Sequence, residues 1–434
     1  MTSEDRSKLR DWYRRNRART RMLFDLIDER AYFERPISLR NPIVFYEGHL
    51  AAFTANIFLK RGLRQSAVNE EFEILFERGI DPESEGDVPN ASRWPSREKI
   101  LDYAAIVDSR IEHAIVNAEI DVAGDPMLDG AAALYTILEH EPMHQETLLY
   151  IFHRLPHELK KKPAGIVLPP PAPKITKGEM ITIYPGLATL GTPRDRFGWD
   201  NEFSEHRVEV EEFEIDEYPV TNEEFLEFVD AGGYEEQRYW KEHWEWLQRE
   251  RITHPLFWEK PGNSWQWRGM FENIPLPPDA PVYVTLAEAA AYARWKWKRL
   301  PSEAEFHRAA YGTPEGTERA YPWGDEVTKA DGNFDLQHFD PIPVGSYPRS
   351  TSAWGVHDLV GNGWEWTTTP FAPFDGFKPM ATYPEYSADF FDEKHFVLKG
   401  ASPATAIELV RRSFRNWFRP TYPYVYAKFR CVSD

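Results

Sequence analysis

A proline-rich stretch divides this sequence into two parts with different patterns. It reads Leu168-Pro-Pro-Pro-Ala-Pro-Lys174, which is typical of an extended polyproline II connector between domains. Before it, apolar residues recur at helical spacing. After it, short β-rich runs alternate with turns and long irregular loops. The 434 residues therefore predict an α+β protein with a helical domain at residues 1–165, a linker at 166–177 and a second domain at 178–434.

The first part is helical throughout and predicts a helix bundle. We expect helices at Ser3–Ile27, Pro42–Lys60, Glu70–Glu77, Ser96–Ala118 and Asp129–Arg154. The last four carry apolar stripes that suit a bundle. The second part predicts strands at Met180–Tyr184 and His206–Phe213. It also predicts two helices, Thr221–Ala231 and Leu286–Trp297, capped by Thr221 or Asn222 and by Thr285.

Two histidines stand four residues apart on an apolar helix face. His140 and His144 lie one above the other, on a face shared with Ala133, Ile137, Leu148 and Ile151. Such a pair can point two ring nitrogens at one iron, zinc, nickel or copper ion. Two core histidines bonded to the backbone or to each other would give the same pattern, so this alternative stays open.

Pro142 and Glu146 belong to the same helix. Pro142 lacks the N–H that would bond Leu138, and this predicts a kink or a bulge in the helix. Glu146 is about 200° around the helix from His144. We therefore expect it to support the ligands or the fold and not to bind the metal.

A third histidine lies on a second helix. Asn41 and Pro42 are typical of an N-cap followed by proline in the first turn. The inward face of that helix would carry Phe45, His49, Phe53 and Ile57. Three histidines from two helices leave positions open for substrate or dioxygen, which is typical of a catalytic site and not of a structural one.

Composition excludes several classes of protein. The net charge of −19, from 70 acidic and 51 basic residues, makes nucleic acid an unsuitable partner. No run of about 18 apolar residues exists, so no membrane span is expected. The basic first 21 residues lack an apolar core and do not read as a signal or transit peptide. The single cysteine, Cys431, forbids an intrachain disulfide and fits a reducing cytoplasm. The oligomeric state is not indicated.

The second part resembles the formylglycine-generating-enzyme, or sulfatase-modifying-factor, family. The segments that carry this resemblance occur in one order, and they include Asp200-Asn-Glu202, Pro219-Val-Thr-Asn222, Arg299-Leu-Pro-Ser-Glu-Ala-Glu-Phe306, Tyr321-Pro-Trp-Gly-Asp325 and Val356-His-Asp-Leu-Val-Gly-Asn-Gly-Trp-Glu-Trp366. The resemblance implies a C-type-lectin-like fold. Within the last segment, Gly361, Asn362, Trp364 and Trp366 are expected to hold the fold together and to touch no substrate.

The first part resembles DinB-like four-helix bundles, whose metal sites use three histidines from two helices. A DinB-like bundle joined to a sulfatase-modifying-factor domain is similar to the ergothioneine-biosynthesis sulfoxide synthases and the related ovothiol and selenoneine enzymes. Their H-x-x-x-H-x-E signature stands here as His140, His144 and Glu146, with His49 as the third ligand. The resemblance implies mononuclear non-haem Fe(2+), dioxygen, and C–S bond formation between a thiol donor and the imidazole of trimethylhistidine (hercynine).

The same resemblance assigns substrate-binding residues. It implies that Asn416 bonds the histidine derivative, that Trp417 faces its quaternary ammonium, and that Arg419 lies beside them. Arg93 and Arg97 stand where the family places arginines that hold carboxylates of the sulfur donor. Because these two could equally be solvated residues at a helix start, that alternative stays open. If Trp417 and the histidines serve one reaction, the site is expected to lie between the two domains.

A tyrosine near the iron is implied as proton or hydrogen donor. The candidates are Tyr383, Tyr386, Tyr422 and Tyr424, and position favours Tyr383. Met143 stands where glutamine is common in the family. Phe418-Arg-Pro420 follows Trp417 where synthases that use γ-glutamylcysteine carry an acidic residue. The donor is therefore open between cysteine and γ-glutamylcysteine.

Three other functions fit parts of the sequence. A DinB-type thiol transferase with zinc or nickel would need no dioxygen, and it would not need the second domain. A formylglycine-type oxidase would need a pair of active-site cysteines, and the chain has one. A lectin-like binding module would use the histidines only structurally.

Overall fold

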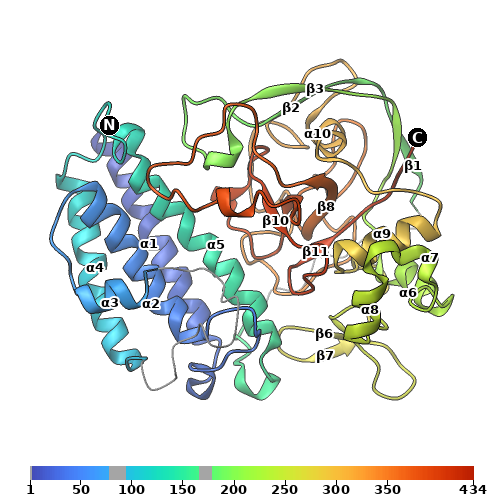
Figure 1. Ribbon diagram of the computed structural model, residues 1–434, viewed down its shortest axis with the longest axis horizontal. Coiled ribbons are helices and arrows are strands. Elements are labelled where there is room, and N and C mark those ends of the chain that lie inside the picture. Colours follow the sequence, from blue (N-terminus) through green and yellow to red (C-terminus); the bar gives the residue numbers. More distant parts are fainter. Residues whose placement is uncertain (1, 78–93, 166–177) are drawn as a thin grey trace. The chain divides into compact units, whose positions relative to one another are not determined.

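The computed structural model describes residues 2–77, 94–165 and 178–434 (Figure 1). The chain forms two compact units. The first comprises Met1–Ala164 together with Pro379–Pro384, and the second comprises Gly165–Lys378 and Glu385–Asp434. The sequence-based division had placed residues 379–384 in the second domain, whereas the structure places them in the helical unit.

The helical unit is a four-helix bundle with one short additional helix. Helices α1 and α2 each pack against α4 and α5, and α3 packs on α2. The bounds are α1 Ser3–Asp25, α2 Ile43–Thr54, α3 Glu70–Leu75, α4 Arg97–Asn117 and α5 Ala132–Arg154. After Thr54 the chain continues as a π-helix, Ala55–Gly62. The predicted bundle is thus confirmed, with helix ends within three residues of the predicted ones when the π-helix is counted as the continuation of α2.

The start of α2 differs from the prediction. Pro42, and not Asn41, is the residue before the first helical position, and no side chain caps the helix. Pro42 has φ −64° and ψ 158°, which is extended backbone, so the helix begins one residue later, at Ile43. The predicted cap at Asn41 is therefore wrong.

Pro142 lies inside α5 and does not end the helix. Helix α5 runs without a break from Ala132 to Arg154, so the predicted bulge at Pro142 is wrong, whereas the predicted kink stays a prediction. The Leu138 carbonyl, which Pro142 cannot bond, accepts a hydrogen bond of 2.7 Å from the side-chain amide of Asn16 on α1. The π-helical segment of the bundle lies elsewhere, at Ala55–Gly62 after α2.

Over residues 178–434, the second unit combines four small sheets with five α-helices. Its strands form the orders β1-β4-β12, β10-β9-β8-β11, β2-β3 and β5-β6-β7. The strands are β1 Met180–Ile183, β2 Gly186–Leu190, β3 His206–Val210, β4 Phe213–Asp216, β5 Trp258–Glu259, β6 Gln266–Arg268, β7 Asn273–Pro275, β8 Gly363–Pro370, β9 Phe396–Ala401, β10 Asn416–Phe418, β11 Ala427–Lys428 and β12 Val432–Ser433. The helices are α6 Asn222–Asp230, α7 Gln237–Trp240, α8 Trp244–Glu250, α9 Leu286–Trp295 and α10 Glu303–Tyr311.

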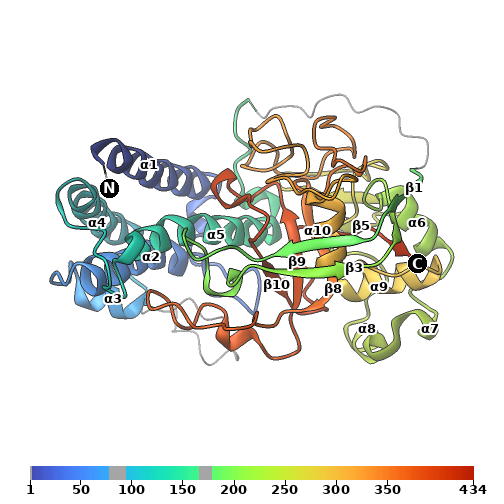
Figure 2. The ribbon, with the colours of Figure 1, turned by 90° about the horizontal axis from the view of Figure 1, so that it is seen from above.

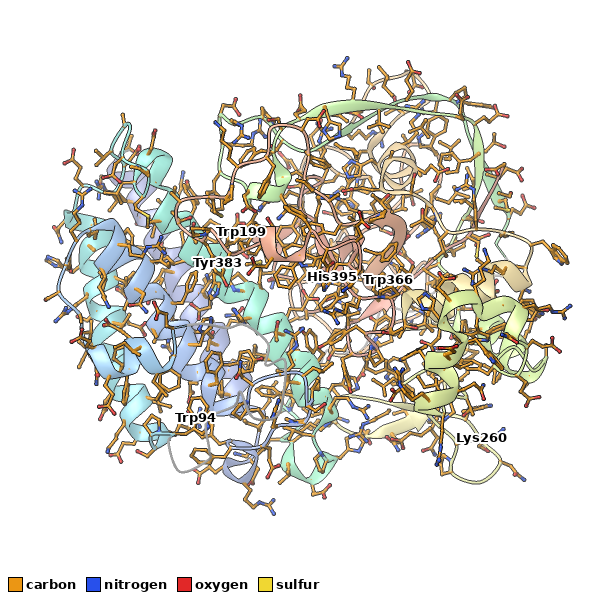
Figure 3. All side chains as sticks on the ribbon, viewed as in Figure 1. Trp94, Trp199, Lys260, Trp366, Tyr383 and His395 are labelled. Atoms are coloured by element: carbon orange, nitrogen blue, oxygen red, sulfur yellow. The ribbon has the colours of Figure 1, made fainter. Side chains whose placement is uncertain are left out.

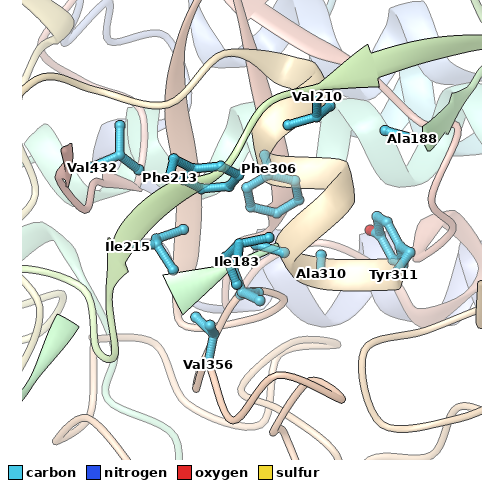
Figure 4. Packing of buried hydrophobic residues seen from close by; sticks show 12 residues of the cluster. Ile183, Ala188, Val210, Phe213, Ile215, Phe306, Ala310, Tyr311, Val356 and Val432 are labelled. Atoms are coloured by element: carbon cyan, nitrogen blue, oxygen red, sulfur yellow. The ribbon is translucent and has the colours of Figure 1, made fainter. Parts of the chain in front are cut away.

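Both predicted helices of this unit are present with their caps. Thr221 begins α6 and Thr285 begins α9, each in a reciprocal bond with a glutamate three residues later. Helix α10, which the sequence analysis missed, packs on the β2-β3 hairpin (Figure 2). Its buried face joins strands β1 to β4 in one apolar core (Figure 4), which contains Ile183, Val210, Phe213, Ile215, Phe306 and Val432.

Asn362 and the first half of β8, including Trp364 and Trp366, are buried, which is consistent with the structural role expected of them. The Asn362 side chain donates to the Ile342 carbonyl at 2.8 Å, and the Trp366 indole donates to the Val284 carbonyl at 2.9 Å. Glu365 is buried against Arg430 and Lys428, at 2.7 and 3.2 Å. Within the described part of the chain, no helix is long and apolar enough to cross a membrane.

Candidate metal centre

The three predicted histidines come together in the bundle. His49 comes from α2, and His140 and His144 come from consecutive turns of α5. One ligand nitrogen from each lies within 4.8 Å of the other two. His49 and His140 are fully buried and His144 is half-buried. This geometry follows from the contact between α2 and α5, which sets an i, i+4 pair opposite a single histidine.

A backbone hydrogen bond fixes the tautomer of His49. Its Nδ1–H donates to the Phe76 carbonyl at 2.8 Å, at the end of α3. A ring that donates from Nδ1 carries its free lone pair on Nε2. The Nε2 atom of His49 is buried and has no hydrogen-bond partner among the described residues. The Phe76 carbonyl thus orients His49 as such bonds orient metal-binding histidines.

The other two rings also carry a buried nitrogen without a partner in the described structure. These atoms are Nε2 of His140 and Nδ1 of His144. Buried polar atoms are nearly always satisfied, so three such nitrogens in one cluster require an explanation. A divalent metal ion bound by three neutral imidazoles supplies it.

Electrostatics keep these rings neutral. Burial lowers the pKa of His49 to about 4, partly offset by its bond to Phe76. Burial also lowers the pKa of His140 and His144 well below the usual value, and the neighbouring histidines add to the effect. Neutral imidazole is the form that binds metal, so the donors fit a metal at neutral pH.

Aromatic rings line the cluster. Phe53 stacks on His140 with centroids 3.5 Å apart and planes 8° from parallel. Phe45 stacks on His49 at 5.1 Å and 17°, and Tyr46 lies 5.8 Å from His144. These apolar faces restrict the rings and lower the local dielectric, which strengthens electrostatic interactions at the site.

Gly48 explains how Phe76 reaches His49. A Cβ atom at Gly48 would lie 2.5 Å from the Phe76 ring, far inside van der Waals contact. That ring also stacks on Trp94, with centroids 5.7 Å apart. Only glycine therefore allows this approach. Sequence reasoning missed Gly48, although an isolated glycine inside a helix beside a ligand is a usable signal.

Tyr383, which Figure 3 labels, belongs to the helical unit. Its ring centroid is 6.1 Å from that of His140 and 5.2 Å from that of Phe53. The other tyrosines considered, Tyr386, Tyr422 and Tyr424, lie in the second unit. Tyr383 is thus the candidate that the structure brings to the histidines.

Arg97 begins α4 and binds a buried glutamate. Its Nη2 lies 3.1 Å from Oε1 of Glu47, and its Nε lies 3.1 Å from Oε2. The guanidinium also lies 5.5 Å from the ring of Tyr32, whose hydroxyl donates to Glu47 at 2.6 Å. A donor carboxylate would compete with Glu47 for Arg97, so its role in donor binding stays a prediction. Arg93 lies outside the described residues.

Asn416 and Trp417 form part of β10 in the second unit, where one face of the indole is covered. Trp417 stacks on Phe371 with centroids 4.1 Å apart, and Tyr386 and Phe390 lie 5.3 and 5.6 Å away. The Asn416 side chain accepts a bond of 2.9 Å from the Trp417 backbone N–H. Arg419 is exposed. The assignment of these three residues to substrate binding stays a prediction.

The fold and the site define a class: a DinB-like bundle with a three-histidine cluster that could hold a metal, joined to a sulfatase-modifying-factor-like domain. Residues 13–148 match the DinB superfamily, and residues 167–434 match the sulfatase-modifying factor enzyme 1-like domain. The chain is 33% identical to a hercynine oxygenase of Mycolicibacterium thermoresistibile, over 97% of this chain and 93% of that one. It is 33% identical to the hercynine oxygenase of Mycobacterium tuberculosis, over 85% and 89%.

A third relative is the ergothioneine biosynthesis protein 1 of Neurospora crassa. It is 26% identical over 94% of this chain and 56% of that protein. This chain belongs to the hercynine oxygenase family, and it is an oxygen-dependent oxidoreductase. The predicted family resemblance is therefore confirmed.

Proposed function

We propose that this chain is a non-haem iron(II) sulfoxide synthase of ergothioneine biosynthesis. It would join a thiol donor, cysteine or γ-glutamylcysteine, to the imidazole of trimethylhistidine with dioxygen as oxidant. One observation carries the proposal: three neutral imidazoles, each with a buried nitrogen that has no partner among the described residues, converge in a chain of the hercynine oxygenase family. We further propose a cytoplasmic location, which fits a chain whose one cysteine is a buried thiol.

The metal is proposed from the donor set. His49, His140 and His144 would hold it through one nitrogen each, leaving positions for the reactants. Imidazole ligands suit iron and zinc alike, so the choice of iron rests on the oxygenase family. When bound, iron(II) would activate dioxygen and lower the pKa of the donor thiol.

The protein's own residues would orient the metal ligands, exclude water and supply a proton. The Phe76 carbonyl holds His49 in the tautomer that a metal requires. Phe45 and Phe53 cover ring faces of two ligands and exclude water there. Tyr383, beside His140, would hold a proton at its Oη and deliver it to the reacting substrate.

Substrate contacts complete the proposal. Trp417 would face the trimethylammonium group with Asn416 and Arg419 nearby, and Arg93 and Arg97 would bind the carboxylate of the sulfur donor. Changing Arg97 to Leu should raise the donor KM more than that for trimethylhistidine. Because this leaves Glu47 buried without its cation, the double change with Glu47→Gln is the matched control.

A formylglycine-type oxidation is disfavoured by Cys431. It is the only cysteine, it is buried, and burial raises its thiol pKa well above the usual value. A reactive thiolate needs exposure and a lowered pKa. The same three histidines would also suit the zinc of a DinB-type thiol transferase, so zinc-loaded protein serves as the control.

One experiment separates these functions. The purified protein is loaded with iron(II) without oxygen, mixed with trimethylhistidine and cysteine or γ-glutamylcysteine, and then exposed to air. Mass spectrometry should show the coupled sulfoxide only with iron and oxygen. Product formed by zinc-loaded protein without oxygen would establish the transferase instead. Replacing trimethylhistidine by histidine tests the ovothiol type of reaction, and a selenium donor tests the selenoneine type.

A further inference from the structure

The chain segment that carries Tyr383 contains no helix or strand. Residues 379–384 form turns and irregular backbone between β8, which ends at Pro370, and the 3-10 turn that begins at Ala388. The position of the Tyr383 ring therefore depends on side-chain bonds to the bundle and not on a backbone ladder.

One bond ties this segment to the helix that carries two metal ligands. The hydroxyl groups of Thr136 and Thr382 lie 2.8 Å apart, and the two residues are 0% and 1% exposed. Thr136 is one helical turn before His140 on α5, and Thr382 directly precedes Tyr383. A buried hydroxyl that loses its partner is costly, so this bond resists separation.

A second tie comes from the π-helix after α2. Arg61 donates through Nη2 to the Ala381 carbonyl at 2.8 Å and through Nη1 to the Thr382 carbonyl at 3.4 Å. Two consecutive carbonyls are thus held by one guanidinium immediately before Tyr383. Arg61 lies on the π-helix that continues α2, the helix of His49, and Thr136 lies on α5, the helix of His140. The elements that carry the ligands therefore also hold the tyrosine segment.

We propose that Thr136 and Arg61 are positioning residues that set the Tyr383 ring beside the three-histidine cluster. Neither residue would touch the substrate; each would act through Tyr383. The proposal rests on the proposed function only for the proton-donating role of Tyr383. The placement of the segment can be tested without any reaction.

The placement test uses a cross-link. In the full-length chain, Thr136→Cys with Thr382→Cys should form a disulfide on mild oxidation, seen as a cross-linked peptide by mass spectrometry. The native Cys431 is buried, so it leaves a clean background. The control pair is Thr54→Cys with Thr382→Cys, because Thr54 is also a buried helical threonine but bonds its own helix at Leu50. Equal cross-linking in both pairs, or none in the first, would overturn the placement.

The functional test compares substitutions at Thr136. Thr136→Val should lower kcat for sulfoxide formation about three- to tenfold, as expected for one lost positioning bond, with the KM for trimethylhistidine and the iron content unchanged. Thr136→Ser keeps a hydroxyl and should restore the rate. Thr54→Val is the matched control and should leave kcat unchanged.

A double substitution shows whether the effect of Thr136 on kcat requires the Tyr383 hydroxyl. In a Tyr383→Phe background, Thr136→Val should cause no further loss of kcat. For Arg61, Arg61→Gln should lower kcat, whereas Arg64→Gln removes an exposed arginine paired with Asp125 and should not. Full additivity with Tyr383→Phe would overturn the positioning role. A wild-type enzyme that makes no sulfoxide would instead reject the proposed function and leave the cross-link result standing.

Discussion

The side-chain amide of Asn16 on α1 supplies the hydrogen bond that Pro142 denies to Leu138 on α5. This bond of 2.7 Å gives the Leu138 carbonyl a partner, and α5 continues past Pro142. In the opposite direction, the side-chain amide of Gln145 on α5 donates to the backbone carbonyl of Asn16 at 2.9 Å. A proline between two ligands is thus accommodated by the neighbouring helix.

Asn16→Ala should therefore destabilise the protein. It leaves the Leu138 carbonyl buried and unpaired, which costs about 1–3 kcal/mol. Denaturant unfolding followed by circular dichroism measures the change. Asn117→Ala on α4 is the control, because Asn117 is exposed and bonds its own helix at His113, so its effect should stay within about 0.5 kcal/mol. Equal losses in both variants would contradict this account.

Replacing His49, His140 or His144 by Ala should each remove most of the bound iron. Each change deletes one of three nitrogens that converge within 4.8 Å. Iron content after anaerobic loading and desalting measures the effect. His113→Ala, an exposed histidine on α4, should keep the full iron content. Stoichiometric iron in all three ligand variants would reject the assignment.

Gly48→Ala should weaken metal binding although Gly48 binds no metal. The new methyl group would meet the Phe76 ring at 2.5 Å and displace the carbonyl that holds His49. Loss of such supporting bonds typically costs about 10- to 100-fold in metal affinity. Metal titration against a competing chelator measures it. Adding Phe76→Leu should recover affinity, since it removes the ring atoms but keeps the carbonyl; no recovery would mean that the clash is not the cause.

Trp417→Ala should weaken binding of trimethylhistidine more than binding of histidine. A cation–π contact with the quaternary ammonium contributes about 0.5–2 kcal/mol, and histidine lacks the methyl groups that form it. Calorimetric titration of both ligands isolates that difference, with iron content as the check on folding. Trp297→Ala is the control, since that tryptophan is 94% exposed. Equal weakening of both ligands would show that Trp417 only packs against Phe371.

The sequence by itself determined features that depend on neighbouring residues. The i, i+4 spacing of His140 and His144 places them on one face of any helix, and the apolar residues around them require that face to be buried. The capping threonines of α6 and α9 act within one turn, so they too were predictable. The change from helical apolar spacing to short β-rich runs, together with the family motifs, identified the family of each half of the chain.

Other features depend on residues far apart in the chain, and only the tertiary structure decided them. The Thr136–Thr382 bond joins residues 246 positions apart, and no local pattern marks either as its partner. The same holds for the bond between Asn16 and Leu138, which no local pattern around Pro142 indicates. Helix packing sets which distant groups meet, because a buried donor must find its acceptor wherever the fold has placed it. The tyrosine beside the histidines is fixed in this way.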